Sequence, residues 1–402
     1  MKRILFVDDE VNVLDGLRNV LRKQRREWDM VFAIGGQAAL DELERAPFDV
    51  IVSDMRMPGM DGAALLQKVK DRYPAIARIV LSGHAEREAV MRTLPVAHQY
   101  LSKPCEEEQL RSVITRTCNL QALLHDETIR SVIGHFDALP SAPQLYSEIT
   151  EAAARSNTTL AVVSRIVEKD PALVAKVLQL VNSAYFGLAH RVTSVQQAVQ
   201  FLGLDLIKGL AMTEHVFAGA TFSPIEGFSV EGLQRHSLLI ARVAKKAMDN
   251  SPRSDEVFAA AIVHDIGKIL LACGFPDRFG EVVRMARERG QPFHQVEPEV
   301  FGTTHAEVGA YLLGAWGLPF AMVEAVAYHH RPELVPDGER EVLMAVYLAE
   351  AFIEARGTGT GAATPPLRPG VLETSGLTAA DVAHWHAVAR QQLEMFARGE
   401  EQ

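Results

Sequence analysis

Short apolar runs alternate with longer amphipathic segments over the first 120 residues of the chain. The apolar runs cover residues 3–7, 30–34, 48–53, 78–81 and 98–101. Between them, apolar residues recur three and four positions apart, which is the spacing of one helix face. Strands that alternate with helices in this way predict βα units on a parallel sheet. We therefore expect residues 1–120 to form an α/β domain of five βα units.

Two of these runs also predict how the sheet is covered. Residues 4–7 read Ile-Leu-Phe-Val and residues 50–52 read Val-Ile-Val, with no polar residue between them. A strand with one face in water alternates apolar and polar residues, whereas a strand covered on both faces does not. We expect helices on both faces of the sheet.

A helical stripe of apolar residues continues from 109 to 124, which is longer than the fifth helix of such a domain needs. We interpret residues 121–138 as a signalling helix or linker that leaves the first domain. The same stripe is a candidate dimer seam, although Thr117 and Gln121 interrupt it. The sequence therefore does not decide whether the chain forms a homodimer.

Strand patterns disappear after residue 139. Asp170 is expected to cap a helix that begins at Pro171, and Ser194 to cap a helix that stops at Gly203. Further helical patterns cover residues 230–247, 255–271, 281–289, 304–313, 320–330, 341–355 and 379–396. We expect an all-α domain over residues 139–335, with a distinct second half at about 228–335. Residues 336–402 are expected to form a helical extension with a flexible segment, rich in Gly, Thr and Pro, at 357–370.

Composition and charge narrow the classes of function. The formal net charge of −10 argues against nucleic acid as the main ligand, because phosphate binding needs a basic surface. No apolar run approaches the roughly 18–20 residues of a membrane-spanning helix, and the apolar start of the chain is too short for a secretory signal. The three cysteines show no CxxC spacing, so neither disulfides nor a thiolate zinc site is expected. We expect a cytoplasmic protein that binds neither DNA nor a membrane.

Acidic residues stand at the ends of two predicted strands. Asp8 and Asp9 end the first strand and Asp54 ends the third. The carboxyl ends of parallel strands share one edge of the sheet, so these carboxylates are expected to converge. Converging carboxylates repel one another unless a hard cation lies between them, which predicts an Mg²⁺ site. Ser82 and Lys103 end the fourth and fifth strands, where a hydroxyl and an ammonium can bind phosphoryl oxygens.

These positions resemble the receiver family of response regulators, which has a flavodoxin-like fold. The resemblance covers nearly all of residues 1–120 and rests on residues 3–11, 48–62, 81–83 and 100–104. It implies that Asp54 accepts a phosphoryl group from a sensor histidine kinase. It also implies that Mg²⁺ is held at Asp8, Asp9, Asp54 and the carbonyl of Arg56. Phosphate-contact and switch roles are implied for Ser82, Tyr100 and Lys103.

Histidines and acids gather in the second half of the helical region. The candidate ligands are His236, His264, Asp265, His305, His329, His330 and Glu350. The histidines share helix faces with apolar residues, so we expect their side chains to point inward. Buried polar groups need hydrogen-bond partners or a metal, and imidazole with carboxylate suits Fe, Mn or Zn. For any single histidine, the alternative is a hydrogen-bonded core residue.

The wider sequence over residues 132–335 resembles the HDOD (HD-related output domain) family. The resemblance rests on residues 139–143, 170–173, 181–187, 198–203, 263–268 and 305–319. That family is related to HD metallo-phosphohydrolases, whose first three metal ligands match His236, His264 and Asp265. Glu350 stands where those enzymes carry Asp, and its extra methylene would displace the carboxylate by about 1.5 Å. No Gly-Tyr-Pro follows His329 and His330, which disfavours hydrolysis of cyclic-di-GMP.

The resemblances leave three hypotheses for the output domain. The favoured one is a non-catalytic switch, in which phosphorylation of Asp54 changes how the HDOD domain binds an unidentified downstream protein. The second is a phosphorylation-gated, metal-dependent phosphohydrolase or phosphodiesterase. The third is a sensor that binds a cyclic dinucleotide without turnover. Whether the chain is an enzyme therefore stays open.

Overall fold

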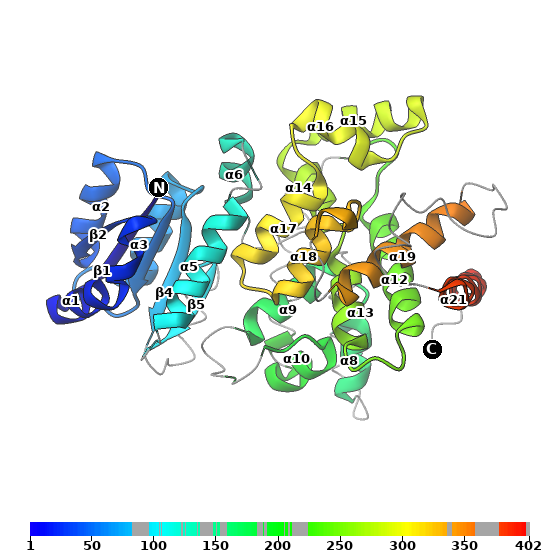
Figure 1. Cartoon of the computed structure of the whole chain (residues 1–402), viewed down its shortest axis with the longest axis horizontal. Coiled ribbons are helices and arrows are strands. Elements are labelled where there is room, and N and C mark those ends of the chain that lie inside the picture. Colours follow the sequence, from blue (N-terminus) through cyan, green and yellow to red (C-terminus); the bar gives the residue numbers. More distant parts are fainter. Residues whose placement is uncertain are drawn as a thin grey trace. The chain divides into compact units, whose positions relative to one another are not determined.

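The five predicted apolar runs form one parallel sheet in the computed structural model (Figure 1). The strands are β1 (Lys2–Asp8), β2 (Trp28–Ile34), β3 (Val50–Asp54), β4 (Ala77–Ser82) and β5 (Gln99–Ser102). Their order in the sheet is β2-β1-β3-β4-β5, and every pairing is parallel. The chain moves to one side of β1 for β2 and to the other side for β3. In open α/β sheets, the carboxyl ends of the strands at such a reversal are where ligands bind.

The described residues fall into two compact units, the first built mainly on residues Met1–Ala138. The structure describes residues 1–82, 96–103, 105, 107–121, 124, 126–134, 136, 148–149, 151–152, 159–182, 188, 191–204, 206–207, 210, 224–335, 340–357 and 378–398. The predicted flexible segment at 357–370 lies almost wholly outside these residues, as do the matched residues 139–143 and most of 181–187.

Helices in the first unit cover both faces of the sheet, as the uninterrupted apolar strands predicted. They are α1 (Val11–Val20), the 3-10 helix η1 (Leu21–Arg26), α2 (Gly35–Arg45), α3 (Gly62–Arg72) and α5 (Glu107–Gln121). Ile4 and Phe6 of β1 pack in one core cluster with residues of α1 and α5. The intervening Leu5 and Val7 point to the other face and are equally buried. Alternate residues of one strand therefore fill two cores.

A separate helix, α6 (Glu127–Gly134), follows α5 within the predicted signalling segment. The apolar stripe had suggested one helix that runs on to Leu124, whereas α5 ends at Gln121. The buried side chains of α6 include Ile129 and Ile133. Residues 127–134, within the predicted signalling segment, therefore form a packed helix of their own.

After residue 139, the described elements are helices, as the loss of strand patterns predicted, apart from an isolated antiparallel bridge between Ile225 and Phe228 (Figure 1). These helices are α8 (Leu160–Val167), α9 (Pro171–Val181), α10 (Val195–Leu202), α12 (Val230–Ala247), α13 (Ser254–Val263), α14 (Ile266–Gly274), α15 (Pro276–Arg289), α16 (Phe293–Phe301), α17 (His305–Ala315), α18 (Phe320–Tyr328), η3 (Pro332–Leu334), α19 (Glu341–Gly357) and α21 (Ala379–Ala397). All belong to the second unit except the ends of α9, from Gln179, and of α17, from Tyr311, which belong to the first.

Two predicted helix caps are present in this unit. The carboxylate of Asp170 accepts a hydrogen bond from the backbone N–H of Leu173 at 3.0 Å, and α9 begins at Pro171. Ser194 caps α10 through the N–H of Gln197, and the helix ends at Gly203 with a positive φ of 76°. Local capping chemistry was therefore sufficient to place these helix ends.

One predicted helix is wrong: residues 255–271 do not form a single helix. A turn at His264 and Asp265 separates α13 from α14. Both helices are apolar on nearly all sides, so the sequence offers no change of periodicity that would reveal the turn.

The expectation about apolar length also needs correction. Within the described residues, one helical stretch, Ser254–Gly274, is long and apolar enough to span a membrane, with a mean hydropathy of 1.7. However, 83% of its most apolar window is buried inside the protein, which is typical of a core helix.

Gly62 shows how closely α3 approaches the carboxyl end of β3. A Cβ atom on Gly62 would lie 2.2 Å from the carbonyl oxygen of Asp54. Gly16, in α1, has no atom within 4 Å of the same added carbon and is therefore a matched control.

We predict that Gly62→Ala lowers the free energy of unfolding of the first unit by about 1–3 kcal/mol, because the added methyl must push the backbone of β3. Gly16→Ala should instead raise it by about 0.5–1 kcal/mol, since alanine favours helix. Urea unfolding of the two full-length variants checks this. Equal effects of the two substitutions would contradict the close approach of α3 and β3.

Candidate functional site

The carboxyl edge of the sheet brings two aspartates and one lysine together. Asp8 ends β1 and Asp54 ends β3, and both side chains are buried. The ammonium of Lys103, just after β5, lies 2.7 Å from Oδ2 of Asp8 and also contacts Oδ1 of Asp54. Because β1 and β3 are neighbours, their carboxylates meet at the same point of the edge.

Negative charge exceeds positive charge at this edge. Burial lowers the pKa of Lys103, but the hydrogen bonds to Asp54 and Asp8 outweigh burial and raise that pKa above its ordinary value. Oδ2 of Asp54 accepts a hydrogen bond from the backbone N–H of Arg56 at 2.8 Å, and Oδ1 of Asp8 accepts one from Glu10 at 2.9 Å. Carboxylate oxygens in excess of one ammonium form a donor set that suits a hard cation such as Mg²⁺.

The remaining predicted residues of this edge lie on the expected elements. Asp9 directly follows β1 and is half-buried, and Arg56 follows β3 with an exposed side chain. Ser82 ends β4, and Tyr100 pairs with Val80 across β5 and β4. The side chains of Ser82 and Tyr100 lie outside the described residues.

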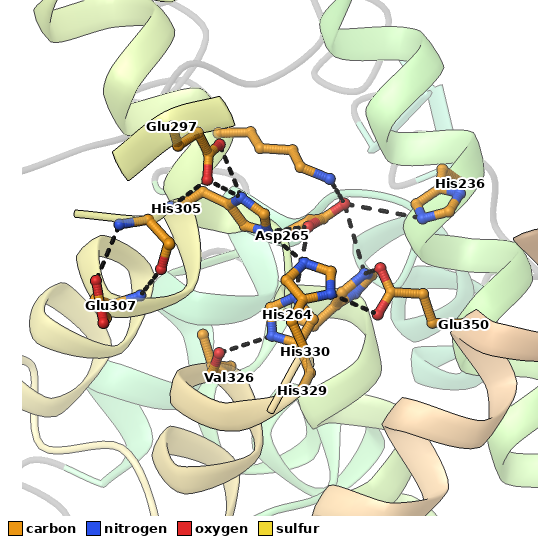
Figure 2. A network of polar contacts seen from close by, with 12 residues as sticks. His236, His264, Asp265, Glu297, His305, Glu307, Val326, His329, His330 and Glu350 are labelled. Carbon is orange, nitrogen blue, oxygen red and sulfur yellow. Dashed lines mark hydrogen bonds and ion pairs between the residues drawn. The ribbon is translucent and has the colours of Figure 1, made fainter. Parts of the chain in front are cut away.

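In the second unit, the predicted histidines and acids meet in one buried cluster, which we call the histidine cluster (Figure 2). His236 lies on α12, His264 and Asp265 form the turn between α13 and α14, His305 begins α17, His329 and His330 directly follow α18, and Glu350 lies on α19. Figure 2 shows these side chains directed toward one another around Asp265. Four separate helix ends and two helix interiors therefore build the cluster.

Two fully buried histidines present a free nitrogen to the centre of the cluster. Nδ1 of His264 lies 2.6 Å from the carbonyl oxygen of Ala261, and Nδ1 of His329 lies 2.7 Å from that of Val326. Since a carbonyl only accepts, each Nδ1 carries the proton and each Nε2 keeps its lone pair. Neither Nε2 has a hydrogen-bond partner. Burial lowers the pKa of His264 and, together with the charge of its histidine neighbours, lowers that of His329 well below the ordinary value.

Asp265 is the central acid, and Lys268 is its closest cation. Nζ of Lys268, one helical turn later, lies 2.6 Å from Oδ2 of Asp265. Burial raises the pKa of Asp265, but Lys268 and the neighbouring histidines together outweigh burial and hold that pKa well below its ordinary value. Oδ1 of Asp265 lies 3.1 Å from Nε2 of His305 without the alignment of a hydrogen bond. Asp265 is therefore an ionised carboxylate with one oxygen directed at the histidines.

Glu297 of α16 orients His305 from the side opposite to Asp265. Its carboxylate accepts hydrogen bonds from Nδ1 of His305 at 2.7 Å and from the backbone N–H of the same residue at 2.9 Å. Burial lowers the pKa of His305, but Glu297, through its charge and hydrogen bond, and Asp265 together outweigh burial and raise it. Nε2 of His305 also lies 3.1 Å from Nε2 of His330. In contrast to His264 and His329, these two rings provide each other's Nε2 atoms with a hydrogen-bond partner.

His236 and Glu350 occupy the periphery of the cluster. His236 was expected to point inward, but about 30% of its side chain is exposed and its Nε2 lies 3.8 Å from Asp265. Burial nevertheless lowers the pKa of His236 to about 4. Glu350 is buried, with Oε1 3.9 Å from Nε2 of His264, and burial raises its pKa well above the ordinary value.

Two sets of four residues could hold a metal ion among the described residues. One set is Asp265, His305, His329 and His330, and the other is His264, Asp265, His329 and Glu350. The second set contains both unpartnered Nε2 atoms, so it is the better candidate. The structure does not bring His236 into either set.

The backbones of α14 and α17 are in direct contact beside the histidine cluster. A Cβ atom on Gly267, at the start of α14, would lie 1.9 Å from the carbonyl oxygen of His305 at the start of α17. The two helix ends therefore touch without an intervening side chain.

Sequence reasoning missed Lys268 and Glu297 as members of the site. Lys268 follows Asp265 by three residues, which places both on one side of a helical turn. Glu297 lies on α16, which was not predicted because Pro292 and Pro298 flank and interrupt its pattern. The signal that could have found Glu297 is its position in the chain, because it is an acid eight residues before His305.

Comparison with known families identifies both parts of the chain. The model of the response regulator receiver domain matches residues 4–115, and the model of the HDOD domain matches residues 139–332. The receiver match implies a histidine kinase as partner, and this domain family generally uses Mg²⁺.

Individual relatives match parts of the chain. An uncharacterized protein of Treponema pallidum is 24% identical over 60% of this chain and 47% of its own length. The hydrogenase transcriptional regulatory protein HoxA of Cupriavidus necator is 34% identical over 31% of this chain and 25% of its own length. The chain thus spans less than half the length of these relatives.

A similar fold occurs in a crystal structure of a virulence factor from Campylobacter jejuni. That protein is 16% identical with a TM-score of 0.52, over 66% of this chain and 97% of the other. The likeness concerns the fold alone. With a receiver domain followed by an HDOD domain, the chain belongs to the two-component response regulators with an HDOD output domain.

Proposed function

We propose that Asp54 accepts a phosphoryl group from a histidine kinase in an Mg²⁺-dependent reaction, and that this changes the protein interactions of the HDOD domain. The observation that carries the proposal is the convergence of Asp8, Asp54 and Lys103 at one edge of the sheet. Asp8, Asp9, Asp54 and the Arg56 carbonyl are the proposed holders of Mg²⁺. When bound, the ion would neutralise the charge that gathers between the carboxylates and the phosphoryl oxygens.

The transfer step follows from the chemistry of these groups. A carboxylate oxygen of Asp54 forms a bond to phosphorus while the bond from phosphorus to the kinase imidazole breaks, and the imidazole leaves with the electron pair. Negative charge builds on the phosphoryl oxygens during transfer. Lys103 supports the proposal because its ammonium already contacts the acceptor carboxylate and can stabilise that charge.

The proposed output is a change in protein binding rather than in DNA binding. Relatives such as HoxA are named transcriptional regulators, but they match a segment about the length of the receiver domain. The net charge of −10 does not favour a nucleic-acid surface. In the histidine cluster, Lys268 lies where a cation would neutralise Asp265, which supports a non-catalytic role for the HDOD domain.

We predict that acetyl phosphate with Mg²⁺ adds one phosphoryl group to the wild-type chain and none to Asp54→Ala. Asp15→Ala, which removes an exposed aspartate of α1, is the matched control and should be labelled like the wild type. Intact-protein mass spectrometry with and without EDTA measures the label. Persistent labelling of Asp54→Ala, or labelling unaffected by EDTA, would rule out the proposed acceptor or its ion.

A second candidate function is metal-dependent phosphoester hydrolysis in the HDOD domain. It is favoured by the two buried Nε2 atoms of His264 and His329, which have no hydrogen-bond partner. Buried polar atoms are normally paired, and each of these rings is held by a carbonyl, as the outer nitrogen of a metal-bound histidine usually is. His264, Asp265, His329 and Glu350 are the proposed ligands. A metal held there would activate water toward a phosphoester.

Metal content tests whether His264, which belongs to the second candidate set alone, is a metal ligand. We expect the purified wild-type chain, dialysed against Zn²⁺ or Mn²⁺ and then against buffer, to keep bound metal that His264→Ala loses. His236→Ala should keep it, because His236 lies in neither set. Elemental analysis measures the metal per chain. A wild-type chain that keeps no metal would exclude this candidate, and equal loss in both variants would place the ligands elsewhere.

Turnover then distinguishes a metal-dependent enzyme from a structural metal site. If the candidate is correct, metal-loaded chain hydrolyses bis-p-nitrophenyl phosphate, and His264→Ala lowers the rate at least about 100-fold. Metal binding without hydrolysis would leave the protein-interaction output as the function of this domain.

A further inference from the structure

The first unit contains a buried arginine whose contacts join the sheet to α6. Arg78 lies at the amino end of β4, and only about 1% of the residue is exposed. Its guanidinium donates hydrogen bonds to the carbonyl oxygens of Pro74 and Ile76 at 3.1 Å each, of Val96 at 2.6 Å and of Gly134 at 2.9 Å. The first three acceptors lie beside β4 and β5, whereas Gly134 is the last residue of α6.

The contact with Gly134 closes the carboxyl end of α6. The last carbonyls of a helix have no partner within the helix and carry the negative end of its dipole. A guanidinium that donates to one of them satisfies the acceptor and complements the dipole. Since both groups are buried, this hydrogen bond lies in a medium where charged interactions are strong.

Close backbone packing accompanies this hydrogen bond. A Cβ atom on Gly134 would lie 2.0 Å from the carbonyl oxygen of Pro74, so only glycine permits α6 to lie this close. Ile129 and Ile133 of α6 are buried as well. The dock of α6 is therefore a specific fit around Gly134 and Arg78.

His98 extends the same network to the amino end of β5. Nδ1 of the His98 ring accepts a hydrogen bond from the backbone N–H of Arg78 at 3.0 Å. The backbone N–H of His98 donates one to the backbone carbonyl of Arg78 at 2.8 Å. Burial, and then the charge of Arg78, holds the pKa of His98 well below its ordinary value, so the ring is neutral. Nη2 of Arg78 also lies 2.9 Å from Nε2 of His98, so the guanidinium contacts the residue that precedes β5.

This network joins β4 and β5, and the same two strands carry Ser82 and Tyr100, the residues for which switch roles are implied. Ser82 ends β4, and Tyr100 lies two residues after His98 in β5. The strands are in continuous register from Ile79 with Gln99 to Ser82 with Ser102. If phosphorylation of Asp54 shifts β4 or β5 at the carboxyl edge of the sheet, Arg78 and His98 at the amino ends of these strands shift too, and they are the groups that hold α6.

We propose that Arg78 is the joint through which β4 and β5 control the docking of α6, and that Gly134 is the contact released or tightened when Asp54 is phosphorylated. The docking rests on contacts within the first unit. The link to phosphate rests on the proposed function of Asp54.

Gly134→Ala tests the joint without altering the sheet. In the full-length chain, its methyl group must displace α6 from Pro74, so amide hydrogens of residues 127–134 should exchange at least about tenfold faster than in the wild type. Gly16→Ala adds the same methyl group in open space and should leave this exchange unchanged. Protection in β1 and β3 should be retained in both variants, which shows that the receiver core is folded.

The response to phosphate is tested with beryllofluoride and Mg²⁺, a mimic of the phosphoryl group. Exchange in residues 127–134 should change at least about threefold in the wild type and should not change further in Gly134→Ala. Arg78→Lys, which keeps the charge but cannot reach all four carbonyls, should behave like Gly134→Ala if its core remains protected.

The outcomes separate the joint from the phosphoacceptor. Unchanged exchange of α6 in Gly134→Ala would overturn the dock. An α6 insensitive to beryllofluoride, in a chain whose Asp54 is labelled by acetyl phosphate, would overturn the coupling alone. Failure of Asp54 to be labelled would overturn the proposed function and the link to phosphate, whereas faster exchange in Gly134→Ala would still support the dock.

Discussion

Both sites of this protein depend on the same constraint, which is that a buried carboxylate needs positive charge beside it. An ionised carboxylate away from water is stable only when a cation and hydrogen-bond donors surround it. At the sheet edge, Lys103 joins Asp8 and Asp54 and still leaves one negative charge in excess. In the histidine cluster, Lys268 and His305 lie on either side of Asp265. The first site therefore attracts a further cation, whereas the second is closer to balance within its own residues.

This difference in balance explains why the two sites support proposals of different kinds. The sheet edge carries hard oxygen donors and one ammonium, which suits an ion and a transferable phosphoryl group. In the histidine cluster, several groups are already paired with one another, since His305 contacts both Glu297 and His330. Three buried atoms of the cluster have no hydrogen-bond partner: Nε2 of His264, Nε2 of His329 and Oδ1 of Asp265. The case for a metal depends on these three atoms and not on the number of histidines.

Sequence alone predicted the parts of the structure that local rules decide. The strands of the sheet, the caps at Asp170 and Ser194, and the meeting of Asp8 with Asp54 follow from periodicity, capping chemistry and the geometry of parallel strands. The turn at His264 and Asp265 was missed because α13 and α14 are apolar all round and show no break in pattern. Glu297 was missed because prolines hide its helix. Which nitrogen of each histidine faces the centre depends on carbonyls such as that of Val326, and no sequence pattern encodes this.

The dock of α6 bears on where the receiver domain can be said to end. The family match stops at residue 115, and α5 stops at Gln121, so either limit would be a natural place to cut the chain. A fragment cut there would leave Arg78 without one of its carbonyl acceptors and would uncover the apolar surface that Ile129 and Ile133 occupy. Such a fragment would expose apolar surface and an unpaired guanidinium N–H at the amino ends of its strands. Its solubility and its response to phosphate would then be properties of the fragment and not of the domain in the intact chain.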